Sequence, residues 1–469
     1  MGAFYNRYTS VPLRSAEFYI PENKYMQVLR KTPEIPSGHL KTNKIKMKNF
    51  LVFTMVITVS LQMNGQQPDT LRISDCFSAA INKSPVSRQT TIAANALKYK
   101  IKNLNTNWLP STVFNAQALY NSETIDFSDL IEGVPLSLPT LPLDQYKFWA
   151  EINQQIFDGG ITKAQKTVER KVYETEVYQT ETDLLSLKQQ VNQVFFSILL
   201  SDKSIETLRI MLDKLTDNKN IISSGVNNGV ILPDMLLAME AEELKLEQQI
   251  DEMKMSKSQL VTTLSTLLDT LISENTILAL PMELMDEKKI NRPELLLFSV
   301  QKERLDAGKK LINSADMPKL FAFSQVAYGR PGYNMISADF HGFYSVGVGL
   351  KWDFLNYGNS KRQKQQLELQ MDLVSIKEDN FNDLLHIQLE NEQLSIEKYQ
   401  MMMEKDEKII ALRKTVTEAS FAKLQRGVIT PNEYLTDQRE EMLARLQTES
   451  HKILKLKSEY NLQLLKGNL

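Results

Sequence analysis

The feature that most restricts the fold of this sequence is the placement of its glycines and prolines. Four long stretches contain neither residue, and they lie between Gly160 and Gly225, between Pro233 and Pro281, between Gly358 and Gly427, and between Pro431 and Gly467. Because glycine and proline are the residues least compatible with a helix interior, we expect long uninterrupted helices in these stretches. The 64 residues between Gly160 and Gly225 would form a helix about 96 Å long at ~1.5 Å per residue.

These breaks recur at fixed distances along the chain, which predicts an internal repeat. The recurring pairs, 208 or 198 residues apart, are Pro85 and Pro293, Pro110 and Pro318, Gly160 and Gly358, Gly229 and Gly427, and Pro233 and Pro431. A single duplication explains both distances if the first copy holds ten additional residues between Pro110 and Gly160. We therefore assign residues 66–289 to repeat 1 and residues 290–469 to repeat 2.

Apolar residues follow a helical period over most of each repeat. In the long helix of repeat 1 they recur at intervals of three and four residues from Leu184 to Ile222. The same spacing runs from Leu246 through Met253 to Leu271 in the returning helix, and it recurs in the last helix of repeat 2. Such spacing is typical of a coiled-coil seam, so we expect the long helices to pack side by side along it.

Just before each long helix the apolar period changes to two, which predicts a β-strand with one apolar and one polar face. The apolar positions are Phe148, Ala150, Ile152 and Ile156 in repeat 1, and Val346, Val348, Leu350 and Phe354 in repeat 2. Residues 112–120 and 319–328 alternate more weakly and are the expected partner strands. Each repeat is thus predicted as a helix, a β-hairpin and a long helical hairpin, with the hairpin tips near residues 225–233 and 427–431.

The N-terminal part of the sequence carries an export signal. A short basic start at residues 47–49 precedes an apolar core at residues 50–61, which is too short to span a bilayer as a helix. We expect residues 47–65 to be a signal peptide, Met47 to be the true start, and residues 1–46 to be a non-native upstream extension. The alternative interpretation of the apolar core is a buried strand. No later stretch is long and apolar enough for a transmembrane helix, and Cys76 lacks the sequence context of lipid attachment.

Export, two-faced strands and very long helices together predict an α+β membrane protein. Strands with an apolar outer face and a polar inner face are typical of a transmembrane β-barrel, and such barrels have at least about eight strands. Since one chain supplies only four, several chains would have to share one barrel. A soluble sheet packed on helices is the alternative, which the signal peptide and the length of the helices disfavour.

Composition and motifs give no sign of an enzyme, a nucleic-acid partner or a metal site. The chain has 55 Lys and Arg against 57 Asp and Glu, a formal charge of −2, so it lacks the basic field that nucleic acid attracts. Cys76 is the single cysteine, and the four histidines are scattered. No nucleotide-binding loop, metalloprotease motif or nucleophile elbow occurs, and we expect neither catalysis nor a cofactor.

Three motifs, in order along the chain, resemble the TolC-type outer-membrane efflux channels from about residue 70 to the end. Residues 71–85 are similar to the family's opening helix. The string Gln-Ile-Phe-Asp-Gly-Gly at 155–160 is similar to the family's strand-to-helix junction, and its weaker copy lies at 354–358. The junction residues are Asp158, Gly159, Gly160, Asn356 and Gly358. The third motif is the hairpin tip at 427–435.

This resemblance implies an assembly and a function. Three protomers would pool twelve strands into one transmembrane β-barrel and twelve helices into a coiled-coil barrel in the periplasm of a Gram-negative bacterium. Such a homotrimer sits among outer-membrane lipid and is a passive exit duct for small molecules or proteins, in multidrug efflux or type I secretion. Its partners are a periplasmic adaptor (membrane fusion) protein and an inner-membrane pump of the RND, ABC or MFS class. The alternative is a periplasmic coiled-coil adaptor or scaffold protein without a pore.

The resemblance also assigns the hairpin tips to adaptor contact. Family tips carry a Gly-hydrophobic-x-Ser/Thr pattern that meets the adaptor. Gly427, Val428 and Thr430 match it in repeat 2. Gly229 and Val230 match it in repeat 1, where Leu232 replaces the hydroxyl residue, so the two tips are expected to contact adaptors unequally.

A ring of acids just after the second tip forms the periplasmic gate in this family. Glu433 falls on its first position, while Thr436 falls on the second and has Asp437 beside it. Ile429 stands where the best-known member has an arginine that braces the closed gate. Three copies of Glu433 around a narrow axis would repel one another and attract cations. The alternative role of Glu433 is to stabilise the N-terminus of the helix that follows Pro431.

Overall fold

The computed structural model describes residues 70–124, 141–284, 288–334 and 337–469. The predicted signal peptide, the extension before it and residues 125–140 of the first hairpin loop lie outside the described residues. All described residues belong to the unit Gln67–Leu469.

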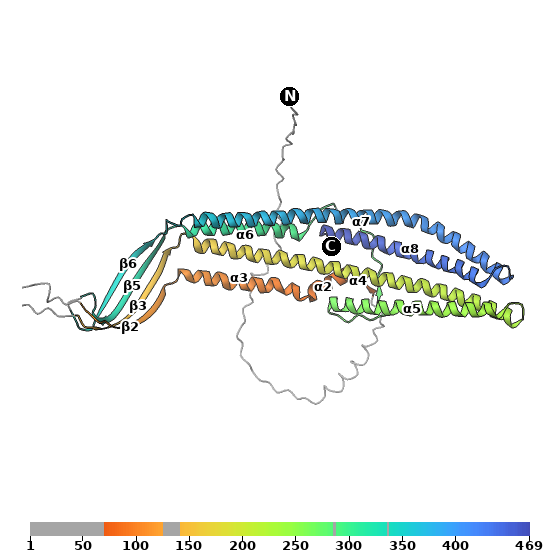
Figure 1. The fold of residues 1–469 in the computed structure, drawn as a ribbon, viewed down its shortest axis with the longest axis horizontal. Coiled ribbons are helices and arrows are strands. Elements are labelled where there is room, and N and C mark those ends of the chain that lie inside the picture. Colours follow the sequence, from red (N-terminus) through yellow and green to blue (C-terminus); the bar gives the residue numbers. More distant parts are fainter. Residues whose placement is uncertain (1–69, 125–140, 285–287, 335–336) are drawn as a thin grey trace, which may run out of the picture. The chain divides into compact units, whose positions relative to one another are not determined.

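Two long helical hairpins dominate the structure. They consist of α4 (Ile161–Asn227) with α5 (Pro233–Leu268), and of α7 (Asn359–Gln425) with α8 (Pro431–Lys466). Each outgoing helix has 67 residues and each returning helix has 36, lengths that fit the expected duplication. Figure 1 shows the hairpins side by side with both turns at the same end.

The boundaries of the long helices coincide with the glycines and prolines noted in the sequence. Gly160 and Gly358 precede the outgoing helices with left-handed φ values of 87° and 74°, a conformation that favours glycine. Pro233 and Pro431 occupy the first helical positions of the returning helices, where the missing N–H of proline costs nothing. The Gly- and Pro-free stretches after Gly160 and Gly358 are therefore helical, as predicted.

The predicted extension of the second helix to Leu271 is wrong. Helix α5 ends at Leu268, because Asp269 turns the backbone into the left-handed region at φ 47°. Leu271 then lies 99% exposed, and Met253, also assigned to the seam, faces solvent. This helix end contains neither glycine nor proline, so the positions of those residues in the sequence could not reveal it.

Shorter helices lead into each strand pair. In the first half these are α2 (Ile73–Lys83), the 3₁₀ turns η2 (Pro85–Arg88) and η3 (Thr106–Trp108), and α3 (Gln89–Asn105). In the second half a single helix, α6 (Pro293–Ala315), takes this place. Pro85 and Pro293 both begin a helical segment, which is the position their fixed φ suits.

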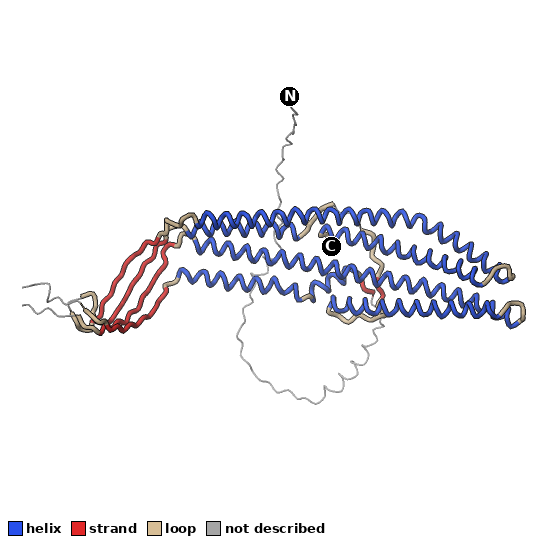
Figure 2. Tube along the Cα trace, viewed as in Figure 1, coloured by secondary structure: helices blue, strands red, loops and turns tan. Residues whose placement is uncertain are grey.

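Four antiparallel strands form one sheet at the end opposite the turns (Figure 2). They are β2 (Ser111–Tyr120), β3 (Asp144–Phe157), β5 (Lys319–Arg330) and β6 (His341–Lys351), in the order β2-β3-β5-β6. Strand β6 ends before Phe354, which was expected inside it. A short parallel pair, β1 (Thr70–Leu71) with β4 (Ile277–Leu278), was not predicted.

The two faces of this sheet differ in composition and in exposure. One face, here called the apolar face, carries exposed residues such as Phe114 (81%), Val346 and Val348 (72% each). On the opposite, polar face many side chains of β3, β5 and β6 are half-buried, and they include Trp149, Glu151, Asn153, Phe321, Phe323, Gln325 and Phe343, whereas most side chains of β2 are exposed on both faces. This distribution is the reverse of a sheet in a soluble protein, where the apolar face is the covered one.

Two apolar clusters hold the helices together. One lies around Phe195 and Phe196 of α4 and includes α2, α5 and the C-terminal half of α8. The other lies toward the turns, where Leu215 and Ile222 of α4 pack with Met239 of α5 and with α7 and α8. The predicted seam of α4 is confirmed by these buried positions. Among the described residues no helix is both long and apolar enough to cross a bilayer.

Candidate functional site at the hairpin tips

The two tips share one backbone turn. Gly229 and Gly427 have φ values of 70° and 68°, and their N–H groups donate to the carbonyls of Val226 and Leu424, each at 2.9 Å. A Cβ added at either glycine would meet no atom within 4 Å. Glycine is therefore favoured there by its backbone conformation alone, since the space around it is open.

The residue that opens the returning helix differs between the tips. At the second tip Thr430 is the N-cap of α8: its hydroxyl accepts from the N–H of Glu433, and the Glu433 carboxylate accepts from the N–H of Thr430 at 2.8 Å. This reciprocal pair is a capping box. At the first tip Leu232 holds the same position in front of α5 without a side-chain cap.

The outermost side chains of both tips are apolar and exposed. Val230 is 78% exposed, and Leu232 and Val428 also face solvent. The next residues, Ile231 and Ile429, turn back and pack against the apolar cluster near the turns. Each tip therefore presents apolar surface from a turn whose inner side is fixed by packing.

Of the two predicted gate acids, neither stands free at the tip. Glu433 is engaged in the capping box, which agrees with the alternative role given to it above. Asp437 is half-buried and accepts a hydrogen bond from the hydroxyl of Ser420 on α7. The hydroxyl of Thr417 donates to the Asp437 carbonyl at 3.2 Å. Asp437 thus ties α8 to α7 within one hairpin.

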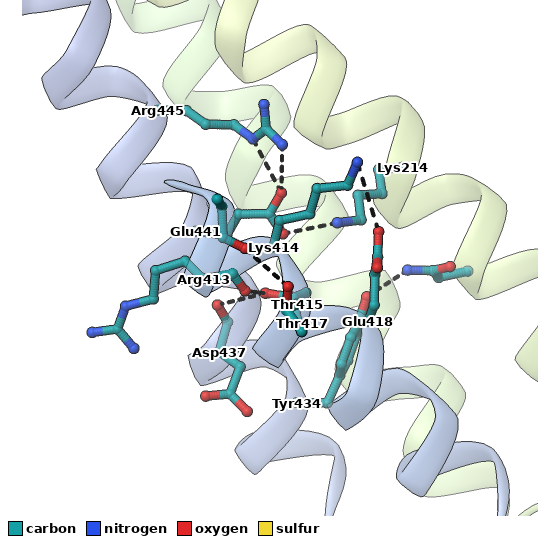
Figure 3. A network of polar contacts seen from close by, with 12 residues as sticks. Lys214, Arg413, Lys414, Thr415, Thr417, Glu418, Tyr434, Asp437, Glu441 and Arg445 are labelled. Carbon is teal, nitrogen blue, oxygen red and sulfur yellow. Dashed lines mark hydrogen bonds and ion pairs between the residues drawn. The ribbon is translucent and has the colours of Figure 1, made fainter. Parts of the chain in front are cut away.

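A buried carboxylate behind the tips joins the two hairpins (Figure 3). Glu441 of α8 is 0% exposed and accepts from Lys214 of α4 at 2.8 Å and from Arg445 of α8 at 2.8 Å. Burial by itself would raise the pKa of Glu441, but the hydrogen bonds from Lys214 and Arg445 outweigh it and lower the pKa. The carboxylate is therefore held ionised between two cations.

Two further contacts connect the hairpins beside Glu441. The amide of Asn218 on α4 donates to the Tyr434 hydroxyl, which burial holds at a pKa raised to about 12. Arg439 of α8 contacts Glu242 of α5 at 3.3 Å. These contacts were not predicted from the sequence, although Tyr434 and Glu441 lie seven residues apart beside the seam residues of α8, which is the spacing of a second contact face.

The predicted strand-to-helix junctions form matching turns. Asp158 accepts from the N–H groups of Gly160 and Thr162 at 2.8 and 2.7 Å. Asn356 accepts from the N–H of Gly358 at 3.2 Å. A Cβ at Gly159 would lie 2.8 Å from Met317 Cβ and from the Ser314 carbonyl, so α6 packs directly on that glycine.

Comparison with known proteins finds one family whose pattern matches part of the chain. Residues 77–269 match the family described as outer membrane efflux protein. This stretch of the chain is similar to outer membrane efflux proteins. The matched residues cover most of the predicted repeat 1, at residues 66–289. The resemblance to TolC-type outer-membrane efflux channels that the sequence motifs indicate is thereby confirmed. No curated protein sequence matches the chain.

Solved structures of outer-membrane channels share the fold over both halves of this chain. CusC is similar with a TM-score of 0.68 at 12% identity, covering 87% of this chain and 95% of that one. The CmeC outer membrane channel of Campylobacter jejuni has a TM-score of 0.63 at 12% sequence identity, covering 84% of this chain and 85% of that one. The outer membrane protein VceC of Vibrio cholerae has a TM-score of 0.64 at 10% sequence identity, covering 84% of this chain and 96% of that one.

Proposed function

We propose that this chain is a passive exit duct of the outer membrane that receives its cargo from an inner-membrane pump through a periplasmic adaptor. The observation that carries the proposal is the inverted sheet, whose large apolar side chains, such as Phe114, Val346 and Val348, are exposed while many side chains of the opposite face are half-buried. Exposed apolar strand residues of this kind are stable in lipid. The family match and the long helical hairpins, which are suited to cross an aqueous compartment, support the same function.

A homotrimer is the assembly that completes the sheet. Strands β2 and β6 lie at the two edges, and neither has a second partner within the described chain. Open edges cannot remain unpaired in lipid, so β6 of one protomer would pair with β2 of the next. Three chains would give twelve strands, an even number as in other bacterial barrels of this kind.

Helix α7 offers a matching surface for neighbouring protomers. Apolar residues recur along its exposed side at helical spacing, and they include Leu369, Leu373, Ile376, Ile387, Leu394 and Leu412. Such a stripe, about twelve helical turns long, is more apolar surface than a monomer normally exposes. Neighbouring protomers would cover this stripe when three chains, each with two repeats, close into a barrel of helices.

At the tips, the exposed Val230 and Val428 are the proposed adaptor contacts, with Gly229, Gly427 and Thr430 shaping the two turns. Glu433 and Asp437 remain the proposed gate acids near the second tip. Because both already have partners within the chain, their release would accompany any opening of this end. Cargo is proposed as small molecules in efflux, or proteins in type I secretion.

Fractionation tests the proposal directly. The full chain, expressed with residues 47–65 intact in a Gram-negative host that lacks its own channel of this type, should be recovered in outer-membrane fractions as heat-modifiable trimers. Recovery as a monomer in osmotic-shock fluid would instead identify a periplasmic scaffold protein. A matched variant, Val346→Lys with Val348→Lys, places two charges on the apolar face and should abolish membrane recovery, because a lysine facing lipid near the bilayer midplane costs about 2–4 kcal/mol.

A further inference from the structure

The charged residues of the four strands are divided unequally between the two faces of the sheet. On the apolar face the charged residues are Asp144 and Arg330, which form an ion pair with each other. The polar face holds Lys147, Lys319 and Lys351 against one carboxylate, Glu151, because these positions alternate with the apolar ones in the strand register. With His341 neutral, three positive charges minus one negative charge leave +2 on the polar face of each chain, although the whole chain carries −2.

Two of these lysines face each other. Lys319 and Lys351 are direct cross-strand neighbours on β5 and β6. Like charges at such positions destabilise a sheet, so packing gives no reason for this pair. Among the described residues neither lysine has an ion pair to a carboxylate. The single acid of the face, Glu151, accepts a hydrogen bond from Asn153 at 2.8 Å and lies on another strand.

Aromatic rings accompany the positive charge on the same face. Lys147 Nζ lies 4.9 Å from the ring centroid of Trp149 and 5.5 Å from that of Phe343. Nearer the helices, Phe321 and Phe323 lie opposite Gly349 and Gly347, and a Cβ at either glycine would approach these rings within 2.4 or 2.7 Å. The rings therefore lie over the glycines, against the wall of the sheet.

We propose that the polar face of the sheet is a cargo-contacting wall that favours organic anions bearing an aromatic group. The inference rests on the proposed duct, in which three copies of this face would surround the lumen and contribute +6. Lys147, Lys319 and Lys351 attract the anionic group, since a lumen lined with one sign of charge concentrates the opposite ion. Trp149, Phe321, Phe323 and Phe343 contact the apolar part by offset or edge-to-face packing.

Conductance of the purified trimer in planar bilayers tests the charge. A variant with Lys147, Lys319 and Lys351 all changed to Gln should lower the chloride-to-potassium permeability ratio at least about threefold, because the lumen loses its positive field. The matched variant with all three changed to Arg should keep the wild-type ratio. All three proteins have the same tips, so a difference between them originates in the sheet. An unchanged ratio in the Gln variant overturns the proposal.

A second measurement separates the rings from the charge. Block of the current by 2-naphthalenesulfonate should weaken about threefold to tenfold when Phe321 and Phe323 are both changed to Leu, the range expected for losing one ring contact. Methanesulfonate, which has the same charge without a ring, should be unaffected. Equal block of both proteins by the naphthalene probe refutes the aromatic part. A wild-type chain that is not recovered as an outer-membrane trimer refutes the duct itself, and the wall with it, whereas a conducting wild type with unresponsive variants refutes the wall alone.

Discussion

Glu441 provides the sharpest test of how the two hairpins are held together. Removing its charge by Glu441→Gln leaves Lys214 and Arg445 facing a neutral amide at the junction of α4 and α8. Losing one partner of a fully buried pair costs about 3–5 kcal/mol. Here both cations are 32% exposed and can be rehydrated, so we expect a smaller loss of about 2 kcal/mol.

A loss of 2 kcal/mol is large enough to be seen locally. It raises the equilibrium constant for opening α8 away from α4 about 30-fold. Hydrogen–deuterium exchange of the trimer should therefore show faster exchange in the part of α8 around Glu441, with the strands unchanged. A double-mutant cycle with Lys214→Met should give a coupling of at least about 1 kcal/mol, because the two residues contact directly.

The neighbouring residue supplies the matched control. Glu440 pairs with Arg413 at 3.0 Å, but both side chains are more than 40% exposed. Glu440→Gln removes the same charge from the adjacent position and should cost no more than about 0.5 kcal/mol. If Glu440→Gln accelerates exchange as much as Glu441→Gln does, the buried pair is not what joins the hairpins and the reasoning fails.

Three further predictions concern the same helices. The additional protection from hydrogen exchange that Glu441 gives should be complete above its ordinary pKa of 4.5, and it should be lost as the pH falls through the lowered pKa of the folded state. The exchange rates of wild type and Glu441→Gln should therefore differ at pH 7 and converge in acid. Gly427→Val should weaken adaptor-dependent efflux with the trimer retained, since an L-residue in the left-handed region costs about 1–2 kcal/mol; wild-type drug resistance would contradict the tip assignment. Thr430→Ala should destabilise the start of α8 by about 1 kcal/mol, and Leu232→Thr should stabilise that of α5 by up to a similar amount, both measured by exchange at the tips.

Much of the fold was predictable because its boundaries are set by local backbone chemistry. Gly160 and Gly358 take left-handed conformations before their helices, and Pro233 and Pro431 open the returning ones. These backbone requirements act within a few residues, so the residue types that meet them can be recognised in the sequence. The strand faces were predictable for the same reason, since alternation along one strand fixes which side chains share a face.

The contacts behind the tips were not predictable in this way. Glu441 and Lys214 are 227 residues apart, and their pairing depends on how α8 lies against α4. Only its seven-residue spacing from Tyr434 distinguishes Glu441 from the half-exposed Glu440 beside it, and this spacing does not identify its partner on α4. The end of α5 escaped prediction because Asp269 adopts a left-handed conformation that glycine or asparagine signals more reliably.

The two tips differ in structure more than their shared backbone turn implies. The second tip has a capped helix start, and its returning helix α8 makes the three polar contacts between the hairpins that lie behind the tips: Asn218 with Tyr434, Lys214 with Glu441, and Glu242 with Arg439. The first tip has an uncapped start and an additional exposed leucine, Leu232. Since the links converge on α8, weakening them frees this helix from both α4 and α5 at once. An adaptor that engages the second tip would thus act on the helix that joins the hairpins, whereas one that engages the first would gain apolar contact without disturbing those links.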